Sequence, residues 1–276
     1  MDLTDDDCVL VDEYDHVLPH LVYAPTSVPG KGANIEEFES QLQGCKCYGD
    51  DVCALSSSCT NAHVCSQNYS SDGTILAHKW VSGSIVECNS QCTCSVKKCG
   101  NRVVQFGPRK NLSVFMTGPE KGYGLKTTEL IPKGEFICEY AGEVIGMDEA
   151  KIRFKAASMK GEMNYIFVLR EFVDSEKKTV TETIIDPSVI GNIGRYINHS
   201  CNPNAGIVPV RVDSPVPVLG IFARRNISAG DEITYDYSGS YNMLSDVSSV
   251  NSFSSKPCRC GSQDCSGSLP FDTSLV

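Results

Sequence analysis

The order of apolar and polar positions divides the chain into a polar, loop-rich first part and a second part typical of a β domain. From Leu112 onward, short apolar runs recur between glycines and prolines, as in domains built from short strands. One stretch, residues 147–160, is rich in alanine, lysine and glutamate and predicts an α-helix. The predicted strands cover residues 113–116, 136–140, 165–169, 182–186 and 218–223.

The first part of the chain contains few runs of this kind. Its start combines acidic patches with several prolines and glycines, which predicts a wrap with few regular elements. In residues 45–100 cysteines outnumber apolar clusters, so we expect metal rather than a core to hold this stretch together. The predicted division is an N-terminal wrap (1–44), a cysteine module (45–110), a β-rich domain (111–240), a serine-rich linker (241–255) and a C-terminal module (256–276).

Composition and charge exclude several classes of protein. Of the 276 residues, 41% are apolar, so the chain can bury a core. No apolar run approaches the roughly 18 residues of a membrane span, and the acidic N-terminus lacks the features of a secretory signal. We therefore expect an intracellular protein without a membrane partner. The formal charge of −10 argues against strong direct DNA binding and favours a basic partner.

Fifteen cysteines in an intracellular chain indicate metal binding, because reducing compartments disfavour disulfides. One tetrahedral zinc takes four thiolates, so Cys201 can complete the trio near the C-terminus. The nine cysteines between residues 45 and 99 can hold three zinc ions if three thiolates each bridge two metals. The expected ligands of these four zinc ions are Cys45, Cys47, Cys53, Cys59, Cys65, Cys88, Cys92, Cys94, Cys99, Cys201, Cys258, Cys260 and Cys265.

Three other interpretations of the cysteines fit the sequence less well. A secreted disulfide protein would suit the Asn-x-Ser sequences of the chain, but no signal peptide precedes them. A DNA-reading zinc module would suit the cysteine spacing, but the acidic charge argues against it. His63 or His78 could replace a thiolate ligand, although the cysteines alone supply enough ligands for four zinc ions.

Several motifs of the second part occur in one order between the two cysteine groups, and together they resemble the SET-domain protein lysine methyltransferases. The nine cysteines resemble that family's pre-SET module and the last three its post-SET module. Residues 101–105, 209–211 and 269–272 resemble in particular the methyltransferase half of SET–transposase fusion proteins. The motifs lie at residues 122–125, 131–134, 139–143, 164–165, 194–204 and 230–237.

The resemblance implies a fold that the periodicity alone does not predict. It is a mostly β SET-domain fold with few short helices and a C-terminal pseudoknot, in which one segment threads beneath another loop. A three-zinc pre-SET cluster and a one-zinc post-SET module flank it. Threading of this kind is rare. It should bring residues 194–204 beside residues 235–237, where members of the family build the active site.

The resemblance also implies methyl transfer from S-adenosylmethionine to a lysine amine. Free lysine has a pKa of about 10.4, so the neutral amine costs roughly 3 kcal/mol at pH 8. An apolar, aromatic channel lowers this cost by desolvation. By resemblance Tyr140 and Tyr237 line the channel, and the Tyr237 hydroxyl orients the amine. Tyr235 stands where a hydroxyl can crowd out a third methyl group.

The cofactor residues are likewise carried over from the family. Arg195 should hold the cofactor's carboxylate, and Gly122 and Gly124 should let the backbone approach the ligand closely. The side chains of Leu269 and Phe271 should fold over the cofactor as a lid. The full set is Lys121, Gly122, Tyr123, Tyr165, Arg195, Asn198, His199, Leu269 and Phe271.

The expected function is mono- or dimethylation of the histone H3 tail, or of another basic peptide that contains lysine, in the nucleus and on chromosomes. The pre-SET cluster favours lysine 9 of H3, while the resemblance to the fusion proteins keeps lysine 36 or a non-histone lysine open. A catalytically silent SET module that binds a basic partner is the alternative from another class. The intact tyrosines and the pair Asn198 and His199 argue against it.

Overall fold

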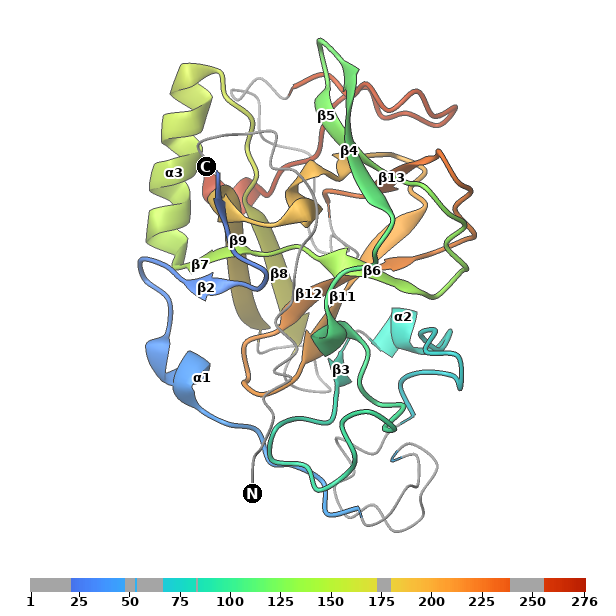
Figure 1. The fold of residues 1–276 in the computed structure, drawn as a ribbon. Helices are drawn as coiled ribbons and strands as arrows, with labels where there is room; N and C mark the ends of the chain where they lie inside the picture. The colour runs from blue at the N-terminus through green and yellow to red at the C-terminus, as the bar shows by residue number, and fades with distance from the viewer. Residues whose placement is uncertain (1–20, 48–52, 54–66, 83, 173–179, 239–255) are drawn as a thin grey trace.

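The described residues form three small β-sheets flanked by one long helix. Helix α3 (Met147–Lys160) runs along one side, and the hairpin of β4 (Leu112–Gly118) and β5 (Gly122–Thr127) lies on the opposite side (Figure 1). The expectation of a mostly β fold with few helices is confirmed. The computed structural model describes residues 21–47, 53, 67–82, 84–172, 180–238 and 256–276, so the serine-rich linker expected at 241–255 lies outside the described residues.

Each sheet joins strands that are distant in the sequence. The first sheet has the order β1 (Val22–Tyr23), β9 (Val180–Gly191), β7 (Gly142–Ile145) and β2 (Val28–Pro29), with β8 (Phe167–Phe172) also paired to β9. The second has the order β10 (Asn198–His199), β13 (Glu232–Tyr235), β5 and β4. The third has the order β3 (Ile85–Val86), β11 (Ala205–Arg211), β12 (Val218–Ala223) and β6 (Phe136–Glu139).

Four of the five predicted strands match observed ones within a residue or lie inside them. The fifth prediction, residues 165–169, begins too early, because β8 starts at Phe167. Just before that point, the Asn164 side chain accepts a hydrogen bond from the Ile166 amide (3.0 Å). The carbonyl of Tyr165 accepts another from a tyrosine side chain, so the backbone here serves side chains instead of a neighbouring strand.

Helix α3 has the bounds that the sequence predicts. Its first turn carries two acidic residues, which suit the positive end of the helix dipole, and Gly161 ends it in the left-handed conformation (φ 70°). Ala150 and Phe154, one turn apart, form its buried face, while Ile152 is exposed. Short helices also occur at Ile35–Glu39 (α1) and Lys79–Ser82 (α2). No helix in the described ranges has the length and apolar character for a bilayer crossing.

The apolar core extends further toward the N-terminus than the sequence suggests. The main cluster lies between the sheets, and a second cluster includes Tyr69, Ile75 and Ile85 packed with Phe136 and Phe222. The ring of Phe222 lies 6.4 Å from that of Tyr69 and 5.3 Å from that of Phe136. The expectation that metal rather than a core holds residues 45–100 is therefore wrong for residues 69–85. The spaced apolar residues of this segment pack against the third sheet.

The described part of the N-terminal wrap, residues 21–44, is bound to the β domain by backbone and side-chain contacts. β1 pairs with β9 and β2 with β7, both in parallel. Between them, Ser27 donates from its amide (3.0 Å) and its hydroxyl (2.9 Å) to Oε1 of Glu139. The Glu139 side chain is buried, and this burial raises its pKa to about 7.

Replacing Glu139 by glutamine is expected to stabilise the protein at neutral and higher pH. The amide oxygen can accept both bonds from Ser27 without a buried charge. The pKa of Glu139 is about 7 in the folded protein and has an ordinary value of 4.5. The free energy of unfolding of the wild type should therefore fall as the pH rises from 4.5 to about 7, and this loss should stay constant at higher pH. The advantage of Glu139→Gln should grow by roughly 1 kcal/mol between pH 6 and 8. Unfolding curves of both proteins at several pH values test this, and parallel pH dependences would contradict it.

Candidate active site and metal centres

The motif segments 194–204 and 235–237 meet in the second sheet, as the sequence analysis expected. β10 and β13 pair in parallel there, with His199 opposite Tyr235. The Asn204 side chain fastens this crossing, because it donates to one backbone group of β13 and accepts from another, each at 2.8 Å. No short turn can join parallel neighbours. Tertiary structure alone therefore assembles the two halves of the site.

A narrow channel lies at the crossing, and six of its lining residues are aromatic. Tyr140, Phe167, Tyr235 and Tyr237 contribute to its wall together with Ile197. The ring of Tyr235 lies 5.9 Å from that of Tyr140 and 4.9 Å from that of Tyr237. Tyr140 and Tyr235 are buried, whereas Tyr237 is half-buried. The three tyrosines proposed from the sequence for catalysis thus stand around one space.

Two of these tyrosines donate their hydroxyl protons to backbone carbonyls. Tyr140 donates to the carbonyl of Tyr165 (2.5 Å). Tyr237 donates to the carbonyl of Ile197 (3.0 Å). Burial raises the pKa of each of the three phenols, so all are neutral at physiological pH. With its proton fixed on a carbonyl, the Tyr237 hydroxyl can offer only lone pairs to the channel.

A larger pocket of about 600 Å³ adjoins the channel, and the two share Tyr165, Arg195 and Tyr237 in their walls. The post-SET segment closes one side of this pocket through Lys256, Cys260 and other residues. Eight of the nine residues expected around the cofactor line it: Lys121, Gly122, Tyr123, Tyr165, Arg195, Asn198, His199 and Leu269.

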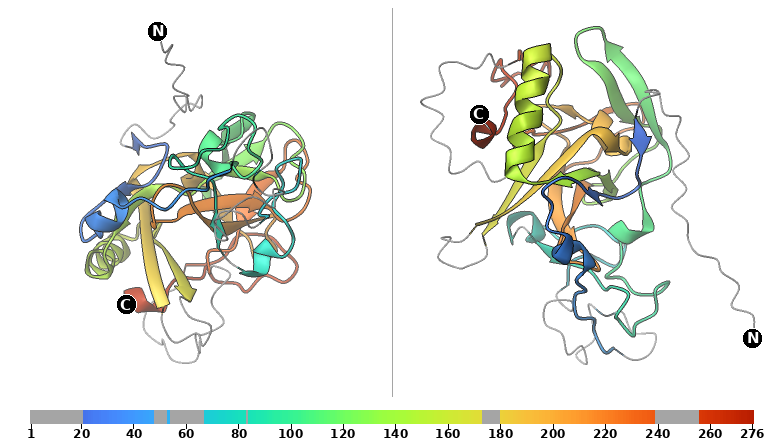
Figure 2. Two further views of the ribbon diagram at one scale, coloured as in Figure 1. Left: turned by 90° about the horizontal axis from the view of Figure 1, so that it is seen from below. Right: turned by 90° about the vertical axis from the view of Figure 1, so that its left-hand side faces the viewer.

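Phe271, the ninth residue, lies elsewhere. Its ring stacks on Phe154 of α3 (5.9 Å between centroids), and the side chain borders the channel instead of the large pocket. The following Leu275 is buried against α3, and Figures 1 and 2 show the C-terminal end beside this helix. The C-terminal segment therefore packs as a wall of the channel, with Leu269 as its contribution to the larger pocket.

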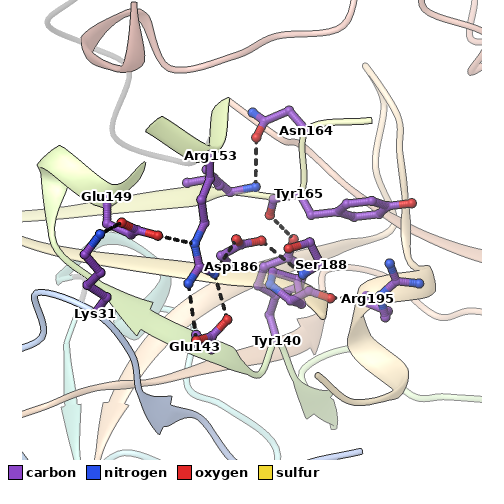
Figure 3. A network of polar contacts seen from close by, with 12 residues as sticks. Lys31, Tyr140, Glu143, Glu149, Arg153, Asn164, Tyr165, Asp186, Ser188 and Arg195 are labelled. Carbon is purple, nitrogen blue, oxygen red and sulfur yellow. Dashed lines mark hydrogen bonds and ion pairs between the residues drawn. The ribbon is translucent and has the colours of Figure 1, made fainter. Parts of the chain in front are cut away.

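Arg195 is a buried cation (7% exposed) that borders both the channel and the pocket. Its Nε donates to the carbonyl of Pro187 (3.0 Å), and its guanidinium lies 4.5 Å from the ring centre of Tyr165 (Figure 3). A guanidinium held in this way can pair with a carboxylate of a ligand.

Asn198 is held by a carboxylate that the sequence analysis did not single out. Its Nδ2 donates to Glu232 (2.8 Å) and to the carbonyl of Tyr123 (3.1 Å). Glu232 also pairs with Lys121 (3.0 Å). The available signal was the place of Glu232 within the motif at 230–237, but its contacts depend on the crossing of β10 and β13.

The ring of His199 links the pocket to the C-terminal cysteines. Its Nδ1 accepts from the amide of Tyr237 (3.2 Å), so the proton of the neutral ring lies on Nε2, which faces Sγ of Cys201 at 3.3 Å. Burial lowers the pKa of His199, which favours the neutral ring. Both ring nitrogens of His199 are therefore used within the protein.

The two glycines of the β5 motif meet different requirements. Gly122 borders the larger pocket and has a φ of 74°, a conformation that other residues rarely adopt. Gly124 does not border the pocket, and a Cβ atom there would lie 2.5 Å from the Thr117 side chain and 3.1 Å from Nδ2 of Asn198, so packing within the protein requires this glycine. The pocket combines aromatic rings, cations and a carboxylate around the backbone of Gly122. This set suits a ligand with a flat base and a charged amino-acid end.

The C-terminal metal quartet expected from the cysteine count is assembled in the structure. The thiols of Cys201, Cys258, Cys260 and Cys265 all lie within 4.8 Å of one another. Four sulfurs bound tetrahedrally to one zinc at about 2.3 Å lie roughly 3.8 Å apart, and Sγ of Cys201 and Cys258 are separated by 3.9 Å. The geometry therefore fits a single zinc that joins the SET domain to the C-terminal module.

The described cysteines of the N-terminal group form overlapping sets, each with its thiols within 4.8 Å of one another. Cys45 and Cys53 each belong to two sets, as do Cys88 and Cys94. Three metals that share bridging thiolates require this kind of overlap. His78 is exposed and belongs to none of these sets, whereas His63 lies outside the described residues, as do the predicted ligands Cys59 and Cys65. The sets are Cys45, Cys88, Cys92 and Cys94; Cys53, Cys88, Cys94 and Cys99; and Cys45, Cys47 and Cys53.

Two polar side chains face the cluster and were not recognised from the sequence as its partners. Arg102, which is buried, places Nη2 3.7 Å from Sγ of Cys94, and Asn101 places Nδ2 3.7 Å from Sγ of Cys88. Three divalent ions and nine thiolates would leave a net charge of about −3. A buried guanidinium beside the sulfurs offsets part of this charge.

Comparison with known proteins gives a consistent result. The family model described as SET domain matches residues 122–238, and that described as Pre-SET motif matches residues 6–102. The mouse histone-lysine N-methyltransferase SETMAR is 41% identical over 92% of this chain and 82% of the mouse protein. The probable histone-lysine N-methyltransferase set-23 of Caenorhabditis briggsae is 39% identical over 91% of this chain and 97% of its own length.

Solved structures give the same picture. The methyltransferase domain of human SETMAR is 40% identical and superposes with a TM-score of 0.77 over 91% of this chain and 90% of that domain. KRYPTONITE, in a complex with mCHH DNA, an H3(1-15) peptide and SAH, is 27% identical with a TM-score of 0.67, over 91% of this chain and 48% of that one.

Proposed function

This chain belongs to the SET-domain histone-lysine N-methyltransferases, and from that premise we propose that it methylates lysine 9 of the histone H3 tail with S-adenosylmethionine as methyl donor. The observation that carries the proposal is the aromatic channel that adjoins the larger pocket and shares Tyr165, Arg195 and Tyr237 with it. A lysine side chain in the channel would meet a ligand in the pocket end to end. The acidic charge of −10 favours a basic histone tail as the partner.

The pocket residues suit S-adenosylmethionine, which supplies an electrophilic methyl group on a positively charged sulfur. We assign Arg195 to the carboxylate of the amino-acid end, because its guanidinium is buried and held in place. The rings of Tyr123 and Tyr165 offer flat apolar surfaces to the base. Asn198, fixed by Glu232, presents its remaining amide oxygen as an acceptor.

The channel residues would act on the lysine amine. The aromatic side chains of the channel wall exclude water, and desolvation lowers the pKa of an amine that enters, so the reactive neutral form becomes accessible near pH 8. The Tyr237 hydroxyl can accept a hydrogen bond from the lysine amine. This bond would hold the lone pair of the amine nitrogen in line with the pocket. Alignment of two reactants supplies several kcal/mol of the barrier reduction in reactions of this kind.

Four zinc ions per chain, three in the pre-SET cluster and one in the post-SET module, complete the proposal. Their role is structural, because the sets are built from cysteine thiols alone and three of them already offer four ligands each. We also propose the module boundaries given by the sequence, with the SET domain at residues 111–240 between a pre-SET module (45–110) and a post-SET module (256–276). A histone substrate places the protein in the nucleus, on chromosomes.

A methylation assay with H3 peptides tests the choice of lysine. The H3(1-15) peptide bound to KRYPTONITE includes position 9 and supports the choice by similarity. We expect methyl incorporation into a peptide that covers lysine 9 and none into its lysine-to-arginine copy. Incorporation only into a peptide that covers lysine 36 would favour that site instead. A correctly folded, cofactor-binding protein that methylates neither peptide would point to a non-histone lysine or to a silent binding module.

Replacing Tyr235 by phenylalanine is expected to change the product more than the first methylation rate. Tyr235 is buried and lines the channel beside Tyr140, so its hydroxyl occupies space there. One neutral hydrogen bond contributes about 1 kcal/mol, and a tenfold change in product ratio requires about that much. The wild type should stop mainly at mono- or dimethyl-lysine, and Tyr235→Phe should proceed further. Mass spectrometry of exhaustive reactions decides this, and trimethyl-lysine as the main wild-type product would contradict it.

A further inference from the structure

Arg153 lies at the centre of an ionic network on α3 (Figure 3) and borders neither the channel nor the larger pocket. Its Nη1 lies 2.7 Å from Glu143 of β7 and 2.9 Å from Asp186 of β9, and its Nε lies 3.0 Å from Glu149 one helical turn earlier. Glu149 in turn pairs with Lys31 of the N-terminal wrap (2.8 Å). The network therefore ties the helix to two strands and to the wrap.

Asp186 is the member of this network that lies deepest, with 2% of its side chain exposed. A carboxylate in such a place requires a compensating charge, and Arg153 supplies it. The other oxygen of Asp186 accepts from the amide of Ser188 (3.0 Å). Asp186 therefore holds Arg153 on one side and the following turn of its own strand on the other.

This turn belongs to an irregular stretch of β9. Glu143 is paired with Asp186, yet the neighbouring Gly142 is paired with Gly191, so residues 187–190 bulge out of the register between β7 and β9. Bulges of this kind redirect nearby groups and are frequent next to active sites. Here the bulge begins directly after the residue that Arg153 pairs with.

The bulge presents the carbonyl of Pro187 to Arg195. That carbonyl accepts from Nε of Arg195 (3.0 Å), and the guanidinium then extends over the ring of Tyr165 toward the cofactor pocket. The direction of a guanidinium depends on where its Nε is bound, because the group is planar and rigid. A shift of the Pro187 carbonyl would therefore turn the cation away from its present position.

We propose that Arg153 is a positioning residue for this enzyme: by pairing with Asp186 it fixes the bulge of β9, and through the carbonyl of Pro187 it sets the direction in which Arg195 faces the cofactor pocket. The inference rests on the proposed function, because it assumes that the pocket takes S-adenosylmethionine. Without Arg153, the buried carboxylate of Asp186 must find water or another cation, and the bulge rearranges to allow this.

The test compares Arg153→Gln with Glu149→Gln, measured as full-length zinc-loaded proteins well below their melting temperatures. Glu149 contacts the same guanidinium from the same helix, but its own ion pairs are with Arg153 and Lys31 and not with β9, so it is a matched control. We expect Arg153→Gln to weaken S-adenosylmethionine binding about tenfold, the size typical of coupling within one network, and Glu149→Gln to change it less than about twofold. Calorimetric titration of the cofactor is the readout.

A double-mutant cycle with Arg195→Gln separates positioning from a general loss of stability. If Arg153 acts through Arg195, adding Arg153→Gln to Arg195→Gln should weaken binding by less than about twofold further. Independent effects that multiply would overturn the proposal, as would unchanged cofactor affinity in a folded Arg153→Gln protein. A wild type that binds no S-adenosylmethionine at all would instead refute the proposed function.

A second variant covers the case in which Arg153→Gln does not fold. Asp186→Asn keeps the acceptor for the Ser188 amide and removes the charge that Arg153 pairs with. It should weaken cofactor binding about tenfold by the same route. Wild-type affinity in folded Asp186→Asn would show that this ion pair does not position Arg195.

Discussion

Replacing Tyr237 by phenylalanine is expected to lower kcat for lysine methylation by about a hundredfold or more. The hydroxyl is the one polar group of this side chain in the channel, and its proton is already bound by the carbonyl of Ile197 (3.0 Å). Its lone pairs are therefore fixed before the substrate enters, and a fixed group requires no reorganisation during the reaction. Phenylalanine keeps the ring and removes this acceptor.

The cofactor should bind to Tyr237→Phe with nearly wild-type affinity. The ring contacts with His199 (5.3 Å) and Tyr235 (4.9 Å) do not involve the hydroxyl, and the backbone amide still donates to His199. Calorimetry of cofactor binding and steady-state kinetics with the H3 peptide separate the two properties.

A matched control for this prediction is Tyr23→Phe, which removes one hydroxyl in β1, outside the channel and the larger pocket. It should keep both activity and cofactor affinity within about twofold, the range expected away from the reacting groups. Near-wild-type turnover by folded Tyr237→Phe would show that this hydroxyl does not orient the amine, and the catalytic role of the channel would then have to rest on Tyr140 or Tyr235.

Removal of the metals should have the second large effect, because the cysteine segments have few other means of staying folded. Elemental analysis should find about four zinc ions per chain. Structural zinc contributes on the order of 10–16 kcal/mol to folding in small zinc modules, and the thiols of each set lie within 4.8 Å of one another. Exhaustive chelation should therefore unfold the cysteine-bearing segments and abolish activity. Survival of both the circular dichroism spectrum and the activity would contradict this.

The post-SET zinc can be tested separately with Cys201→Ser. This variant should contain about one zinc fewer, because a serine hydroxyl is a poor zinc ligand. Loss of the zinc also leaves residue 201 without its anchor beside His199, whose Nδ1 accepts from the amide of Tyr237, so activity should fall even though the pre-SET cluster stays intact. Full activity with three zinc ions would show that the C-terminal site does not support the channel.

The sequence alone was sufficient to predict features that depend on local residues or on the number of ligands that a metal requires. Helix α3 was predicted with its observed bounds, because its composition and the glycine at its end act within one segment. The C-terminal quartet followed from the four-ligand requirement of zinc, although Cys201 lies far in the chain from its three partners. The order of the motifs was enough to indicate the family and a mostly β fold.

Tertiary structure decided which groups face one another. The pairing of Glu232 with Lys121 and Asn198 and the network around Arg153 join segments that are distant in the sequence. Their charges look like ordinary surface charges in the sequence. The apolar residues near Ile75 also could not be placed from the sequence, because they pack against a sheet whose strands come much later in the chain. Local propensity acts over a few residues, whereas the crossing of β10 and β13 is stabilised only when the whole core forms, so these contacts could be read only from the folded chain.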